Sequence, residues 1–181
     1  MAFVILAAMK VLQHTLLLLA AVFLLSCKDE FKQAHTQAKP LDNVIDTVDA
    51  QRESVVAFAK TYMGTAYCYA SSDPRKGFDC SGFVNYVFNH FNIELPRSSS
   101  GFQNLGRTLR PDEFKVGDVL VFYGYKDTKN IGHVGIVCEA NGMKSKFIHA
   151  SSGKEMAVTI SELGSDTYTK RFYKCINPFK L

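Results

Sequence analysis

The second half of the sequence contains five short apolar runs separated by turn residues. The first run lies between Gly117-Asp118 and Gly124, and the third follows Asn141-Gly142. Runs of this length that are rich in Val, Ile, Phe and Tyr are typical of β-strands. Because the connections are short, we expect neighbouring strands to be antiparallel. The predicted strands are residues 119–123, 133–138, 146–150, 156–160 and 171–176.

Two segments ahead of these strands follow a helical period instead. Residues 51–63 and 80–91 place apolar side chains three and four positions apart, and Gly64 follows the first segment as a stop. Asp79 immediately precedes the second segment, where it can cap the helix. Helices followed by closely connected strands predict an α+β fold, with the helices packed on an antiparallel sheet of about five strands.

Composition excludes several classes of protein. Apolar residues make up 47% of the chain, which is too few for a multi-pass membrane protein and too many for a disordered chain. Residues 27–181 carry 20 Lys and Arg against 17 Asp and Glu, a net of +3. That charge is too weak to indicate a nucleic-acid partner. One soluble domain is therefore expected, and we expect it to be a monomer.

The first 26 residues are typical of an export signal. Ten unbroken apolar residues, 16–25, follow Lys10; they are too short to cross a bilayer core of roughly 30 Å. The signal ends at Leu24-Leu25-Ser26-Cys27, which resembles a lipobox and predicts lipidation of Cys27. An ordinary signal peptide with an incidental Cys is the alternative.

These features divide the chain into a signal peptide (1–26), a lipidated Cys27 with a flexible tether (27–50) and one folded domain (51–181). The lipid would anchor the protein to a membrane. The predicted location is the outer membrane, facing the periplasm. Lys28-Asp29-Glu30 resembles a signal for the cell surface, which is the alternative location.

Cys80 stands where the second predicted helix begins. The helix dipole favours a thiolate at this end, so we expect a lowered thiol pKa and a nucleophilic Cys. A buried structural Cys is the alternative. His133 opens a predicted strand and His149 lies on the next one. If these strands form a hairpin, His149 can orient His133 as the third member of a catalytic triad does.

Five motifs follow one another between residues 78 and 152. They are Phe78-Asp79-Cys80-Ser81-Gly82-Phe83-Val84, Leu95-Pro96-Arg97-Ser98-Ser99, Val116-Gly117-Asp118-Val119-Leu120-Val121-Phe122, Gly132-His133-Val134-Gly135-Ile136 and Phe147-Ile148-His149-Ala150-Ser151-Ser152. In this order the motifs resemble the NlpC family of papain-like cell-wall cysteine peptidases. The resemblance covers about residues 50–176 and implies a papain-like fold with the catalytic Cys at a helix N-terminus.

The resemblance implies a peptidoglycan hydrolase that cleaves stem peptides, either between γ-D-glutamate and a diamino acid or at the D,D cross-link. It makes Cys80 the nucleophile, His133 the base and His149 the third polar member. It also places Tyr67 near the oxyanion, and Asp79 with Ser81 near a free amine of the substrate. It implies no cofactor, and the absence of a Cys-x-x-Cys pair gives no support for a metal site.

Other readings stay open at this stage. A thiol acyltransferase or amidase could use the same framework, and a non-catalytic wall-binding lipoprotein is a third candidate. The family usually has a Trp and two Gly where this chain has Tyr69-Ala70-Ser71, so the resemblance does not fix the scissile bond. Cys138 and Cys175 are expected to be buried thiols, with a disulfide between them as the alternative. Cys68 near the site could be a redox liability.

Overall fold

The computed structural model of the chain describes residues 41–181, with side chains from residue 47 onward. The predicted signal segment 1–26, the lipidation site Cys27 and the tether over residues 28–40 lie outside the described residues. The chain divides into two units, Met1–Val44 and Ile45–Leu181. The second unit contains the sheet and all the other candidate site residues.

Helix α2 (Leu41–Lys60) is longer at its start than the helix predicted over residues 51–63. Residues 41–50, which the sequence analysis assigned to the tether, are helical in the structure. The cause is visible in the sequence, where apolar residues at positions 41, 44, 45 and 48 continue the helical spacing. Val55, Val56 and Ala59 are buried near the end of the helix, and Gly64 then turns the chain with a φ of +80°.

The five predicted strands form one antiparallel sheet, as expected. Along the sheet the order is β6-β5-β4-β3-β7, so the last strand returns beside the first strand of the sheet. All four neighbouring pairs are antiparallel. The strands are β3 (Val119–Tyr123), β4 (Ile131–Glu139), β5 (Lys146–Ala150), β6 (Val158–Glu162) and β7 (Phe172–Ile176).

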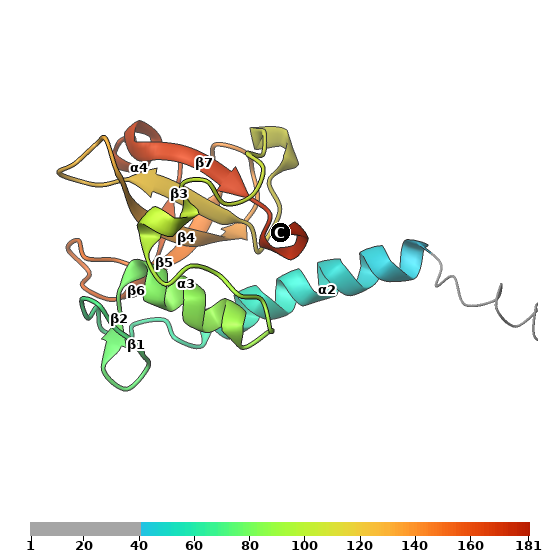
Figure 1. Ribbon diagram of the computed structural model, residues 1–181, viewed down its shortest axis with the longest axis horizontal. Coiled ribbons are helices and arrows are strands. Elements are labelled where there is room, and N and C mark those ends of the chain that lie inside the picture. The colour runs from blue at the N-terminus through green and yellow to red at the C-terminus, as the bar shows by residue number, and fades with distance from the viewer. Residues whose placement is uncertain (1–40) are drawn as a thin grey trace, which may run out of the picture. The chain divides into compact units, whose positions relative to one another are not determined.

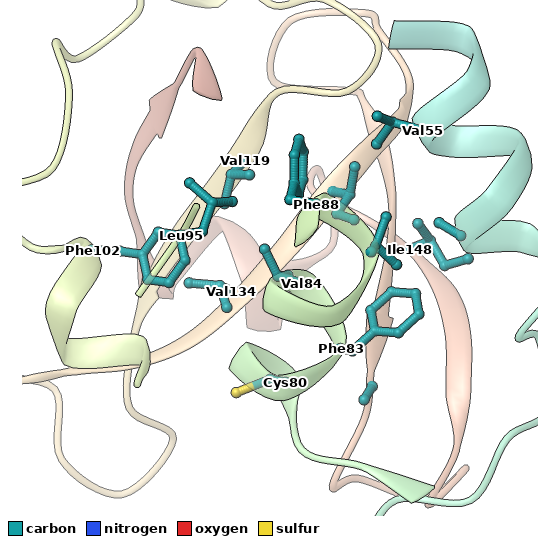
Figure 2. Packing of buried hydrophobic residues seen from close by; sticks show 14 of the residues in the cluster. Val55, Cys80, Phe83, Val84, Phe88, Leu95, Phe102, Val119, Val134 and Ile148 are labelled. Carbon is teal, nitrogen blue, oxygen red and sulfur yellow. The ribbon is translucent and has the colours of Figure 1, made fainter. Parts of the chain in front are cut away.

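Helix α3 (Cys80–Asn89) packs against β4 and β5 (Figure 1). Asp79 caps it, as predicted. Figure 2 shows Phe83, Val84 and Phe88 among the side chains of the sheet, with Cys80 at the end of the helix. Val134 and Ile148, which belong to this core, are fully buried. The predicted α+β arrangement, helices on a five-stranded antiparallel sheet, is confirmed.

The remaining elements are short. Helix α4 (Asp166–Arg171) was not predicted; its six residues are too few for a helical period to stand out in the sequence. None of the helices in residues 41–181 has the length and apolar character needed to span a bilayer. The others are β1 (Ser72–Asp73), β2 (Gly77–Phe78) and the 3₁₀ turns η1 (Ser99–Phe102), η2 (Pro111–Glu113) and η3 (Pro178–Lys180).

A buried ion pair joins α2 to the start of β3. One Nη of Arg52 donates to the carboxylate of Asp118 and to the carbonyl of Val116, each at 2.8 Å. The guanidinium also lies 4.5 Å from the centroid of the Phe179 ring. Asp118 is 1% exposed and Arg52 is 4% exposed, so neither charge can be solvated if the other is removed.

We predict that Arg52→Leu lowers the free energy of unfolding by about 3–5 kcal/mol, because it leaves the Asp118 carboxylate buried without its cation. Urea titration measures the change. The matched control is Arg75→Leu, since Arg75 pairs with Asp73 at the surface; its unfolding midpoint should stay close to that of the unmodified protein. Similar losses in the two variants would contradict a special role for the buried pair.

Candidate active site

Cys80 is fixed at the first turn of α3 by contacts on both sides. The Asp79 carboxylate accepts the N–H of Gly82 at 2.6 Å, and the Asp79 N–H donates to the Ser71 carbonyl at 2.9 Å. The Cys80 Sγ lies 3.9 Å from the carbonyl oxygen of Gly132. The thiol is therefore held against the backbone of β4, at the residue that precedes His133.

The two histidines form a hydrogen-bonded pair, as the hairpin prediction required. Nε2 of His133 and Nδ1 of His149 are 3.0 Å apart. Nε2 of His149 lies 2.9 Å from the Ser161 hydroxyl and 3.4 Å from that of Tyr168. His149 is fully buried and His133 is 8% exposed. Since Nε2 of His133 faces His149, its Nδ1 is left for the thiol side.

Glycine at position 135 makes this arrangement possible. A Cβ at this position would press into the Phe147 ring and lie 3.1 Å from the Cβ of His149. The ring of Phe147 packs against that of His149, with centroids 4.8 Å apart. Any larger residue at 135 would push β5 away and separate the histidines. Packing against β5 therefore explains the second glycine of the Gly132-His133-Val134-Gly135 motif.

A pocket of about 460 Å³ opens beside Cys80. Tyr67, Asp79, Cys80 and Ser81 line it, so the structure brings these four predicted residues together. Arg97 also lines the pocket and was not assigned a role from the sequence. Its two Nη atoms reach the two carboxylate oxygens of Asp79 at 3.0 and 2.8 Å. The Asp79 charge is therefore already compensated before any ligand arrives.

Burial controls the protonation of the candidate catalytic groups. It raises the pKa of the Cys80 thiol, and the nearby Asp79 charge adds to the shift. Burial is also the main reason that the pKa of His133 lies well below its usual value, and electrostatic interactions with His149 and Arg171 lower it further. The pKa of His149 falls to about 4, mainly through burial. All three groups are therefore neutral at pH 7.

The expectation of a lowered Cys80 pKa is contradicted. The helix N-terminus is present, but desolvation of the thiolate outweighs it. No hydrogen bond joins Cys80 to the His133 ring anywhere in the described structure. Catalytic hydrogen bonds are often long before substrate binds. Proton transfer from Cys80 to His133 during the attack therefore fits this arrangement better than a thiolate–imidazolium pair formed beforehand.

Three residues of the site were missed by the sequence analysis. Ser161 and Tyr168 contact His149 from β6 and α4, and Arg97 contacts Asp79. Only Arg97 lay in a motif. The other cysteines, Cys68, Cys138 and Cys175, are free thiols, and the open alternative of a Cys138–Cys175 disulfide is not what forms. Among the described residues no cluster of three His, Cys, Asp or Glu can hold a metal ion.

Comparison with known proteins identifies the family. The NlpC/P60 family model matches residues 64–177. The chain belongs to the NlpC/P60 family. The expected family is thereby confirmed, and so is the enzyme class, a cysteine endopeptidase. Family members share the fold found here: the NlpC/P60 domain of the peptidoglycan hydrolase SagA superposes with a TM-score of 0.56 at 26% identity, over 70% of this chain and 97% of that one.

Curated relatives of this NlpC/P60 chain differ in length. A probable endopeptidase of Haemophilus influenzae is 30% identical over 92% of this chain and 98% of its own. The murein DD-endopeptidase MepS/murein LD-carboxypeptidase of Escherichia coli is 31% identical over 72% of this chain and 64% of its own. The gamma-DL-glutamyl hydrolase of Bacillus subtilis is 39% identical over 65% of this chain. The chain spans only 27% of that last relative.

The raised pKa of Cys80 predicts how its alkylation depends on pH. Thiolate is the reactive form, so the rate of reaction with iodoacetamide should rise with a midpoint above the ordinary thiol value of about 8.5. Peptide mass spectrometry of samples quenched between pH 5 and 10 measures this rate, with Cys68 in the same samples as the internal reference. A midpoint below pH 7 would instead establish a preformed thiolate–imidazolium pair.

Proposed function

We propose that this protein is a lipid-anchored peptidoglycan hydrolase that cleaves amide bonds in stem peptides, with Cys80 as nucleophile, His133 as base and His149 as the orienting residue. The observation that carries the proposal is a chain of hydrogen bonds that joins His133, His149 and Ser161. His133 stands at one end of this chain, and the residue before it, Gly132, contacts the Cys80 thiol. A histidine pair with a purely structural role would not require a Cys at the start of a helix, and lining a pocket, beside it.

The hydrogen bonds favour one set of tautomers. A base needs an unprotonated Nδ1 on His133, so its Nε2 carries the proton and donates to Nδ1 of His149. The second nitrogen of His149 then carries a proton and donates to the Ser161 hydroxyl. This row stays satisfied when His133 becomes doubly protonated. A neutral His149 orients the base but supplies no negative charge, unlike an Asp in the same place.

The reaction then proceeds in two halves. The Cys80 proton passes to Nδ1 of His133 as the sulfur attacks the amide carbon, and the oxyanion accepts the backbone N–H of Cys80 and the Tyr67 hydroxyl. His133 gives the proton to the leaving amine, and a thioester remains. His133 next takes a proton from water, the hydroxide attacks the thioester, and the acid departs as the thiol regains its proton.

The bond cleaved is either γ-D-glutamyl–diamino acid or the D,D cross-link. Relatives are named for each: a gamma-DL-glutamyl hydrolase and a murein DD-endopeptidase. Tyr69 and Ala70, where this chain departs from the family pattern, line the pocket that contains Cys80. Tyr69 is 85% exposed, so its ring is free to contact a substrate. This loop is where we place the choice between the two bonds.

The pocket favours a peptide over an acyl chain. Its lining includes a carboxylate, a guanidinium, hydroxyls and two tyrosines, and such groups bind amide and carboxylate atoms better than methylene groups. The acyltransferase reading is therefore the second candidate. A non-catalytic wall-binding role is the third candidate, because it does not explain the buried hydrogen-bonded pair of His133 and His149.

Cleavage of purified muropeptides tests the proposal. The unmodified protein should release fragments whose masses name the bond, and Cys80→Ala should reduce kcat at least a thousandfold because no other nucleophile is available. Cys68→Ala is the matched control and should keep its activity. Retained cleavage in Cys80→Ala would refute the assignment, and a folded protein that cleaves no muropeptide would favour the acyltransferase.

The lipid anchor is a separate part of the proposal and rests on the lipobox-like motif Leu24-Leu25-Ser26-Cys27. Cells that express the full chain and are fed a radiolabelled fatty acid should incorporate label into this protein, and Cys27→Ser should abolish the incorporation. We propose the outer membrane facing the periplasm as its location, with the cell surface as the alternative. Unlabelled protein in the membrane-free fraction would show that residues 1–26 form an ordinary signal peptide.

A further inference from the structure

A second pocket shares Gly132 with the pocket that contains Cys80. Its volume is about 540 Å³, and His133 lines it while Cys80 does not. Gly132 lines both pockets. A peptide that crosses Gly132 would therefore place its two halves in different pockets, one beside the thiol and one beside the imidazole.

Chemistry assigns a direction to these two pockets. The acyl half stays bonded to Cys80 in the thioester, so it occupies the pocket that Cys80 lines. The amine half must receive a proton from His133 before it leaves, so it occupies the pocket that His133 lines. The second pocket is then the leaving-group pocket of the proposed reaction.

Positive charge in this leaving-group pocket is not neutralised. Arg171 and Lys126 both line it. Among the ion pairs of residues 41–181, none includes either of these two cations. The other five arginines of the chain each pair with a carboxylate: Arg52, Arg75, Arg97, Arg107 and Arg110. Arg171 is thus the exception, although it is only partly exposed.

The guanidinium of Arg171 is held in place through its Nε atom, and its two Nη atoms remain available to a ligand. Its Nε donates to the carbonyl of Tyr123 at 2.9 Å. Its central carbon lies 5.7 Å from the Tyr125 ring and 5.8 Å from the Tyr168 ring. Neither Nη atom makes a hydrogen bond within the described structure. A fixed guanidinium with two available Nη donors matches the two oxygens of a carboxylate.

We propose that Arg171, assisted by Lys126, binds a free carboxylate on the leaving half of the substrate. The inference rests on the proposed function and names its substrate class: stem peptides whose leaving amino acid carries an unamidated carboxylate. Two sources share this chemistry. One is the terminal carboxylate of the leaving peptide, and the other is the second carboxylate of a diamino acid.

Binding of that carboxylate would also assist the proton transfer. The positive charge of Arg171 contributes to the low pKa of His133. A carboxylate beside Arg171 offsets this charge, so His133 accepts the thiol proton more readily once the correct substrate is bound. The pocket would then couple substrate recognition to the base.

The experiment compares substrates that differ only on the leaving side. Three versions of a cleavable stem peptide carry all carboxylates free, the terminal one as a carboxamide, or the second carboxylate of the diamino acid as a carboxamide. With the full chain, we expect one amidation to lower kcat/KM roughly tenfold to hundredfold, mainly through KM, because a charge-assisted bidentate contact is lost. Which amidation has this effect identifies the source.

The variant that tests the residue is Arg171→Gln, in which the free and amidated substrates should differ by less than about twofold. A purely structural role would lower both rates and leave their ratio unchanged. Lys126 is exposed, so the Lys126→Gln variant should fold. It should reduce the ratio of kcat/KM between the free and the amidated substrate severalfold. Lys129→Gln, on the same loop but outside the pocket, is the matched control and should keep the full ratio.

The outcomes separate this inference from the proposed function. No cleavage of any version by the unmodified protein would overturn the proposed function and this inference with it. Equal cleavage of all three versions would leave the proposed function standing and overturn the carboxylate pocket. A full ratio in both Arg171→Gln and Lys126→Gln would overturn the assignment to these cations. If Arg171→Gln fails to fold, the test rests on Lys126→Gln: a reduced ratio supports the carboxylate pocket, and an unchanged ratio overturns it.

Discussion

The close contact between the first turn of α3 and the loop that ends at Ser71 determines where the site is. Gly82 has no side chain, and a Cβ there would collide with the Ser71 carbonyl. Asp79 reinforces the contact, because its N–H bonds Ser71 while its carboxylate caps the helix and pairs with Arg97. The position of Cys80 between Asp79 and Gly82 follows from these contacts. Residues 71, 79–82 and 97 are therefore linked into one support for Cys80, the proposed nucleophile.

The sheet sets the other half of the site through its register. Ile136 pairs with Ile148 and His149 pairs with Thr159, so the side chains that alternate with the core residues meet on the opposite face. His133 and His149 share that face with Phe147. Burial there keeps both imidazoles neutral. In the proposed mechanism, charge is created only during the reaction, where the oxyanion donors can stabilise it.

Sequence reasoning succeeded where the information was local. The cap at Asp79, the helix beginning at Cys80 and the strand runs depend on neighbours within a few residues, and all were found. It also paired His133 with His149, because a hairpin brings adjacent strands together.

It failed where distant segments decide the outcome. Ser161 reaches His149 only through the β5–β6 register, and Tyr168 through a helix too short to predict. The sign of the Cys80 pKa shift was wrong because the helix dipole is a local feature, whereas burial depends on the whole fold. The unpaired state of Arg171 is of the same kind: a list of charges in a sequence does not tell which arginine lacks a carboxylate.

Gly132 explains how the two pockets can serve one peptide. It is exposed, and a Cβ on it would press into the backbone of Gly124, so two glycines on β4 and the neighbouring loop lie in contact without side chains. Gly132, which lines both pockets, therefore presents only backbone atoms to a bound peptide. On one side Asp79 and Arg97 neutralise each other, while on the other Arg171 and Lys126 are both positive. A peptide with a neutral or zwitterionic acyl half and an anionic leaving half fits this polarity in only one direction, and that direction places its scissile amide between Cys80 and His133.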